Sequence, residues 1–302
     1  DLVAQGWIEG TSQGYDKALA LYSEDVIAFI RATQPDEYAK FAKRNASNTD
    51  AALCAMIAKN LDNHGALYGL RHEIRDINAR FRLCQFAPDL PSPAIQAKFD
   101  ANILRVVRQV YYSEHNTNSM DVVLFVNGIP VATMELKTDF TQNVQDAIQQ
   151  YKFDRNPKDP KTRHDEPLLT FKRRALVHFA VSTDEVYMSS CLNGKDTRFL
   201  PFNKGHADGA AGNPVNPNGY ATDYLWREVL ARDAWLNILG RYVHLEVKEK
   251  EDFQGKRYKE ESIIFPRYHQ LDVVKNLVHD AQSHGAGKRY LIQHSAGSGK
   301  SN

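Results

Sequence analysis

The sequence predicts an α/β fold in which a mixed β-sheet is flanked by helices. Segments with the apolar spacing of helices fill the start of the chain, whereas residues 105–192 contain Val-, Tyr- and Phe-rich stretches separated by turn residues. The predicted order in this region is helix, three strands, helix and two strands. Two of those strands are joined by a short turn, so the sheet must be at least partly antiparallel.

Composition is that of an ordinary globular protein. The chain has 302 residues, 42% hydrophobic and 25% charged, which is enough for one large or two ordinary domains. Its net charge of +1 indicates no class of partner. Cys54, Cys84 and Cys191 form no Cys-x-x-Cys pair, which argues against a zinc site and favours a reducing compartment. With no membrane-length apolar run, and Asp1 rather than Met at its start, we expect a fragment of a cytoplasmic protein.

Residues 1–85 are predicted to be mostly helical. Ser23, followed by two acidic residues, is a plausible helix start, and Pro35 begins a new segment. A further helical pattern stops at Gly65. After a proline-rich loop, residues 95–107 are predicted to form another helix.

The predicted sheet lies in the middle of the chain. Residues 120–137 are predicted to form two strands joined at Asn127-Gly128, with a helix over 142–155 and two more strands within 173–192. A Gly-, Asn- and Pro-rich loop and a helix containing Trp226 and Trp235 follow. The charged run after them is expected to be a solvated hairpin or linker. We therefore predict three parts, residues 1–247, a linker at 248–262, and a second domain at 263–302.

The end of the chain has the pattern of a triphosphate-binding loop. A helix, a Gly-bearing turn and a strand are predicted to lead into a loop whose core is Gly297, Ser298, Gly299, Lys300 and Ser301. Small residues allow backbone N–H groups to face the phosphates, while the lysine reaches the β- and γ-phosphates and the last serine binds Mg²⁺. His294 replaces the first glycine of the strict pattern, so this is the looser form typical of helicase-type motors.

A glutamine upstream of this loop is a candidate adenine-binding residue. Helicase-type motors place such a glutamine some tens of residues before the phosphate loop, and Gln270 occupies that position. Phe265, Arg267 or Tyr268 could stack on the ring. Taken alone, Gln270 would be expected on a solvated helix face.

Two carboxylates and a lysine lie on the two strands that the Asn127-Gly128 turn joins. Alternation places Glu135 and Lys137 on the same face, and Asp121 begins the preceding strand. Asp121 and Glu135 are candidate ligands for one or two Mg²⁺ ions, with the Leu136 carbonyl as a third ligand. The metal would polarise a scissile phosphate and activate a water that Lys137 orients. The alternative is a surface salt bridge at a strand end.

Strand register constrains this site. A strict two-residue turn would pair Asp121 with Met134 and leave Glu135 on the opposite face of the sheet. The site therefore requires a shift of one residue, through a longer loop or a bulge. Pro130 favours an irregular turn because it cannot donate a ladder hydrogen bond.

Together these features resemble the motor (R) subunit of type I restriction–modification enzymes. The resemblance rests on Asp121, the Glu135-Leu136-Lys137 string, the helix at 142–155, Gln270 and the terminal loop. It implies a PD-(D/E)xK restriction-endonuclease-like domain followed by the first βα elements of a RecA-like helicase domain. It also implies that Asp121, Glu135 and Lys137 cleave DNA.

Related nucleases carry a Gln-x-x-x-Tyr motif on the next helix, from which this chain departs. Gln150 is the best candidate for the glutamine, but Asp154 then stands at the tyrosine position, and Gln149 would instead place Phe153 there. Tyr151 and Arg155 are candidates to take over the DNA-contacting role.

A basic stretch follows the predicted helix. Residues 152–174 hold eight Lys or Arg against four Asp or Glu, and Lys172, Arg173 and Arg174 are candidate DNA-backbone contacts. Such charge runs are usually solvated surface.

The resemblance implies a type I site-specific deoxyribonuclease, with Mg²⁺-dependent cleavage of double-stranded DNA coupled to ATP-dependent translocation. Its implied partners are DNA and the methyltransferase and specificity subunits, with S-adenosylmethionine acting only in the holoenzyme. An alternative is a translocase accessory module whose inert nuclease fold binds DNA or subunits. A small P-loop kinase is a third reading, but it leaves Asp121 and Glu135 unexplained.

Overall fold

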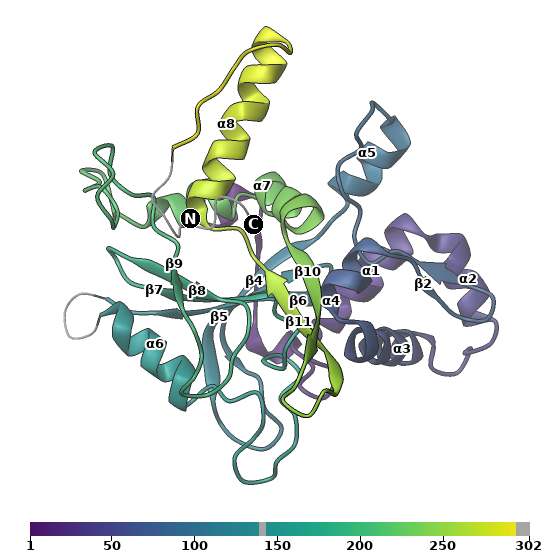
Figure 1. Cartoon of the computed structure of the whole chain (residues 1–302). Helices are drawn as coiled ribbons and strands as arrows, with labels where there is room; N and C mark the ends of the chain where they lie inside the picture. The colour runs from purple at the N-terminus through teal and green to yellow at the C-terminus, as the bar shows by residue number, and fades with distance from the viewer. Residues whose placement is uncertain (139–142, 294–302) are drawn as a thin grey trace.

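The computed structural model describes residues 1–138 and 143–293, and a seven-stranded mixed sheet lies at its centre (Figure 1). The strand order is β1-β4-β5-β6-β7-β8-β9. Neighbouring strands are antiparallel except for the parallel pairs β1–β4 and β6–β7. This confirms the predicted mixed α/β class. The strands span Ile8–Gly10 (β1), Leu104–Tyr111 (β4), Ser119–Val126 (β5), Ile129–Leu136 (β6), Val177–Val181 (β7), Val186–Ser189 (β8) and Leu200–Pro201 (β9).

Three helices at the start of the chain have the boundaries predicted at Ser23, Pro35 and Gly65, and a fourth, which was not predicted, follows directly. They are α1 (Ser23–Thr33), α2 (Pro35–Ala42), α3 (Thr49–His64) and α4 (Ala66–Arg71). Gly65 ends α3 with a φ of +90°, and a Cβ there would meet the Lys172 carbonyl oxygen at 2.9 Å. Glycine is therefore required at this helix junction.

The first 85 residues are less helical than predicted. They also contribute β1 to the sheet, a small hairpin of β2 (Ile74–Arg75) and β3 (Arg80–Phe81), and two short 3₁₀ turns at Val3–Gln5 and Ser12–Gly14. The helix expected over 95–107 is α5, Pro93–Asp100. It stops early because the chain enters β4 at Leu104, where pairing with β1 and β5 outweighs helical periodicity.

Two apolar clusters pack on the sheet. The larger contains side chains from α1, α3 and α4 and from the segment around Trp235, which is α7 (Arg232–Asn237) between two π-helical turns, Leu225–Val229 and Ile238–Tyr242. The smaller lies beneath α6 (Val144–Phe153) and includes Val123 and Phe125 of β5. The β5 strand is thus buried on both faces, which places its neighbour β6 near the middle of the molecule (Figure 1).

The charged run after α7 forms a hairpin, which was one of the two predictions for it, the other being a linker. It consists of β10 (His244–Glu251) and β11 (Arg257–Ile264), paired over all eight residues of each strand. Phe265, just beyond it, is buried against Phe179 and Phe202 of the sheet region. Residues on both sides of the hairpin therefore share one core.

The last described element is α8 (Tyr268–His284), which extends away from the sheet (Figure 1). A strand was predicted after it, but residues 286–293 are coil. Leu291 is 92% exposed, so this apolar run finds no strand to pair with among the described residues. The phosphate-loop residues Gly297, Ser298, Gly299, Lys300 and Ser301 lie outside the described residues. In the part of the chain that is described, no helix is long and apolar enough to cross a membrane.

Candidate active site

The β5–β6 hairpin has the one-residue shift that the carboxylate site requires. Next to the turn, Val126 pairs with Ile129 and Phe125 pairs with Pro130, as in a strict two-residue turn. Beyond them Leu124 pairs with Ala132, so that Val131 is an extra residue in a β-bulge. The new register puts Asp121 opposite Glu135, on the face of the sheet that α6 covers.

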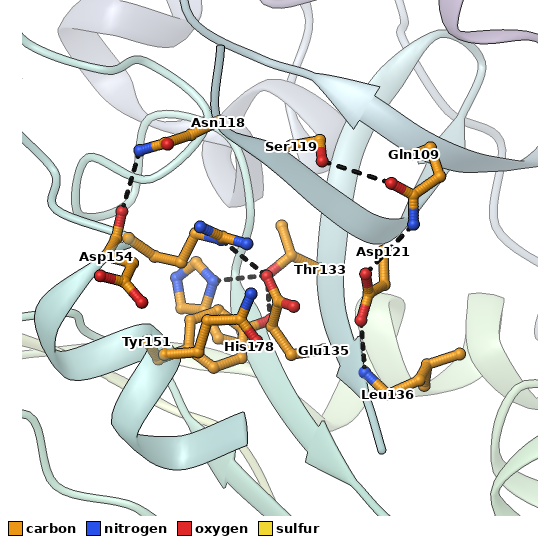
Figure 2. A network of polar contacts seen from close by, with 12 residues as sticks. Gln109, Asn118, Ser119, Asp121, Thr133, Glu135, Leu136, Tyr151, Asp154 and His178 are labelled. Carbon is orange, nitrogen blue, oxygen red and sulfur yellow. Dashed lines mark hydrogen bonds and ion pairs between the residues drawn. The ribbon is translucent and has the colours of Figure 1, made fainter. Parts of the chain in front are cut away.

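The two carboxylates have different surroundings (Figure 2). Glu135 is fully buried, its Oε1 accepts a hydrogen bond from Arg155 Nε at 2.7 Å, and its Oε2 has no donor among the described residues. Asp121 is half-buried and accepts on both oxygens. Its Oδ2 takes the Leu136 backbone N–H at 2.8 Å and its Oδ1 takes the Gln109 Nε2 at 3.2 Å.

Burial governs the charge of Glu135. The pKa of its carboxyl group is raised to about 8, because loss of solvation, together with the nearby Asp121 carboxylate, outweighs the lowering effect of the Arg155 guanidinium. A carboxylate oxygen that is buried, lacks a donor and lies beside a second carboxylate fits a divalent cation. A bound cation would favour the ionised form that burial disfavours.

The protein supplies only part of a metal coordination sphere here. In the described parts of the chain, no three His, Cys, Asp or Glu side chains gather closely enough to hold a metal ion. Asp121 and Glu135 would therefore need a backbone carbonyl, for which Leu136 is the candidate, and water to complete the set of oxygen ligands that Mg²⁺ prefers.

Lys137 and Gln150 meet at the same end of the sheet. The Lys137 backbone N–H donates to the Val181 carbonyl at 2.8 Å, which extends the β6–β7 pairing by one residue. The Lys137 Nζ donates to Gln150 Oε1 on α6 at 2.7 Å. The helix itself is fixed by a capping box in which Asn143 accepts from Gln145 N and Asp146 accepts from Asn143 N. The structure thus brings together the four residues predicted to be catalytic.

A buried polar network lies next to Glu135. The Thr133 Oγ1 is 2.8 Å from the Tyr151 hydroxyl oxygen and 2.8 Å from His178 Nδ1 (Figure 2). Burial lowers the pKa of His178 to about 3, so the ring is neutral at pH 7. Burial also raises the pKa of the Tyr151 hydroxyl well above its usual range. Thr133 and His178 were missed in the sequence because each reads as an ordinary strand residue.

Tyr151 and Arg174 are not placed to contact DNA, which corrects the sequence interpretation. Both residues are buried. The Arg174 guanidinium donates to the carbonyl oxygens of Leu19 and Ala20 at 2.7 and 3.1 Å and pairs with Asp62 at 2.9 Å. These contacts hold the start of the chain against the segment before β7, which is a structural role.

The other predicted DNA-contacting residues form ion pairs. Arg155 is buried with Glu135, as described above. Lys172 pairs with Glu261 of the hairpin, and Arg173 pairs with Asp165 at 3.0 Å. The side chains of Lys172 and Arg173 keep about a quarter to a third of their surface exposed (25% and 31%).

The predicted adenine-binding residue caps a helix. Gln270 Oε1 accepts the Arg267 backbone N–H at 2.8 Å at the start of α8. Phe265 and Tyr268 are 6% and 7% exposed, so neither offers a free face for stacking on an adenine ring. Of the residues considered for stacking, Arg267 alone is not buried.

One known family matches the part of the chain that contains the two carboxylates. Residues 89–197 match the family model described as "Type I restriction enzyme R protein N terminus (HSDR_N)". The matched segment contains the whole β4–β5–β6–α6 unit, and with it all four predicted catalytic residues. No curated protein matches the sequence significantly.

Proposed function

Because this chain belongs, through residues 89–197, to the N-terminal family of type I restriction enzyme R proteins, we propose that it is the Mg²⁺-dependent nuclease part of such an R subunit. Its substrate would be double-stranded DNA. The mixed sheet with the carboxylates at one strand end is consistent with a restriction-endonuclease-like fold of the PD-(D/E)xK type.

One observation carries the proposal. The Val131 bulge puts Asp121 opposite Glu135, and the buried Glu135 Oε2 has no donor in the described structure. A protein that used these residues only for stability would be expected to satisfy that oxygen, since an unpaired buried acceptor costs about 1–3 kcal/mol. A cation bound between Asp121 and Glu135 would compensate for the unpaired oxygen, which explains both the bulge and the missing donor.

The residues divide the work of phosphodiester hydrolysis. Asp121 and Glu135 would hold Mg²⁺, which supplies charge stabilisation at the phosphate and lowers the pKa of bound water. Lys137 balances negative charge that develops on the phosphate and orients the attacking water. Gln150 fixes the lysine through its 2.7 Å hydrogen bond, and Arg155 holds the Glu135 carboxylate in one orientation.

Coupling to a motor is the second part of the proposal. The loop Gly297–Ser301 and Gln270 would bind ATP, and the nuclease would act with translocation of DNA and with the methyltransferase and specificity subunits of the same system. S-adenosylmethionine would belong to that holoenzyme and not to this chain. The support for this part is the family match and the sequence of the terminal loop.

The test is the double substitution Glu135→Ala with Lys137→Ala, assayed in the reconstituted restriction complex. We expect ATP hydrolysis to continue and DNA cleavage to disappear. The matched control is Glu249→Ala with Lys259→Ala, an opposed Glu–Lys pair on the exposed β10–β11 hairpin, which should cleave normally. ATP-dependent cleavage that survives the Glu135 and Lys137 substitutions would refute the nuclease assignment and favour an inert module that binds DNA or subunits.

A further inference from the structure

Gln109 has an unusual backbone conformation in the middle of β4. Its φ is +50°, in the left-handed region, although the residues on either side pair regularly with β5 as Arg108 with Val122 and Val110 with Met120. Residues other than glycine rarely adopt this region, because the Cβ atom crowds the following carbonyl oxygen. Such strain persists only where the surrounding contacts compensate for it, and it is common at functional sites.

Side-chain alternation along β4 is interrupted at the same place. Val107 and Val110 both pack in the cluster beneath that helix, although they are three residues apart and regular alternation would send them to opposite faces. The break in alternation occurs at the left-handed residue between them. By the strand register, Gln109 lies opposite Asp121.

The Gln109 side chain bridges two residues of β5 (Figure 2). Its Nε2 donates to Asp121 Oδ1 at 3.2 Å, and its Oε1 accepts from the Ser119 hydroxyl at 3.3 Å. The serine orients the amide so that its N–H₂ end faces the carboxylate. With the Leu136 N–H on the other oxygen, both oxygens of Asp121 are held and the plane of the carboxylate is defined.

We propose that Gln109 is a positioning residue for the Asp121 carboxylate in the metal site, an inference that rests on the proposed function. A neutral amide suits this role because it leaves a lone pair on each oxygen for a cation and brings no positive charge that would compete with one. Glu135 differs, because its buried carboxyl group contacts the positively charged Arg155. The strain at Gln109 is retained because the left-handed turn aims the amide at Asp121.

Two variants separate positioning from stability. Gln109→Gly relieves the strain and removes the amide, and Gln109→Asn tolerates the left-handed conformation with an amide that is one methylene shorter. If Gln109 were merely structural, easing the strain would leave metal binding intact. If it positions Asp121, both variants should bind Mn²⁺ about tenfold more weakly than the wild type while remaining folded.

The measurement is Mn²⁺ binding to the chain without ATP or DNA, followed by calorimetry or electron paramagnetic resonance. Asp121→Asn identifies the signal that belongs to this site. Gln96→Ala is the matched control, because Gln96 is an exposed glutamine that donates to Asp100 at 2.8 Å on α5, away from the carboxylates. In the reconstituted complex, Gln109→Gly should need about tenfold more Mg²⁺ for half-maximal cleavage and reach the wild-type maximal rate.

The outcomes are distinguishable. If Asp121→Asn removes Mn²⁺ binding and the two Gln109 variants bind as the wild type does, the positioning role is wrong and the metal site stands. If Asp121→Asn leaves Mn²⁺ binding unchanged, the proposed function fails and the positioning role fails with it. A reduced maximal cleavage rate with an unshifted Mg²⁺ requirement would also overturn the positioning role.

Discussion

Glu135→Gln should make the protein more stable at alkaline pH, not less. The glutamine has the shape of the protonated acid, and burial raises the pKa of Glu135 from 4.5 to about 8 in the folded protein. As the pH rises above 4.5, the unfolded chain ionises this group while the folded chain does not. The wild type therefore loses stability between pH 4.5 and pH 8, and the loss levels off above that range.

The magnitude follows from the size of the shift. Raising the pKa from 4.5 to about 8 corresponds to a loss of about 5 kcal/mol of free energy of unfolding. Glu135→Gln should lack this dependence, match the wild type near pH 4.5, and exceed it by about that amount above pH 8.

The assay is urea unfolding over a range of pH in the presence of a chelator. Glu249→Gln, on the exposed hairpin, is the control and should follow the wild type. Adding Mg²⁺ at pH 8 should stabilise the wild type, because the ion binds only the folded carboxylate pair, and should leave Glu135→Gln unaffected. Identical pH profiles for the wild type and Glu135→Gln would refute the burial argument for Glu135.

Three further substitutions test the neighbouring contacts. Gln150→Ala should slow cleavage by up to about tenfold, since Lys137 loses one hydrogen bond, whereas Lys137→Ala should slow it by about a hundredfold or more. The rates are compared in single-turnover cleavage, and equal losses would contradict the supporting role of Gln150. Arg174→Met should lower the free energy of unfolding by about 3 kcal/mol, because the carbonyl oxygens of Leu19 and Ala20 lose their donor. Arg173→Met, at a surface pair, should change it by less than about 1 kcal/mol, and similar effects of the two substitutions in urea unfolding would argue against the structural role of Arg174. Thr133→Val should destabilise the protein by roughly 1–3 kcal/mol, because Tyr151 and His178 lose their shared partner, and unchanged thermal unfolding would show that another group replaces the threonine.

The carboxylate site was predictable because local rules determine it. Alternation placed Glu135 and Lys137 together, and counting residues around Asn127-Gly128 showed that a shift was needed to bring Asp121 to Glu135. The structure has that shift at Val131. The sequence could not specify whether a longer loop or a bulge would produce it, because both solutions use the same residues.

The errors concern contacts between distant parts of the chain. Arg174 belongs to a basic run and reads as solvated surface, but its partners Leu19 and Ala20 are about 150 residues away and have no sequence signal. Tyr151 faces the sheet, where the hydroxyl of Thr133 satisfies its polar end. The left-handed backbone conformation of Gln109 was also not predictable from the sequence, because glutamine has no preference for that conformation.

The bulge at Val131 makes the proposed cleavage activity depend on the number of residues in a hairpin as much as on their identity. A relative that keeps an Asp, a Glu and a Lys in the same order and the same bulge, but has one residue more between Ala132 and the turn, would place its two carboxylates on opposite faces of the sheet. Such a protein would carry a complete motif and cut nothing. Surveys that recognise nucleases in genomes by these three residue types alone would therefore count inactive proteins as active ones. The spacing between the turn and the Glu should be scored together with the residue types.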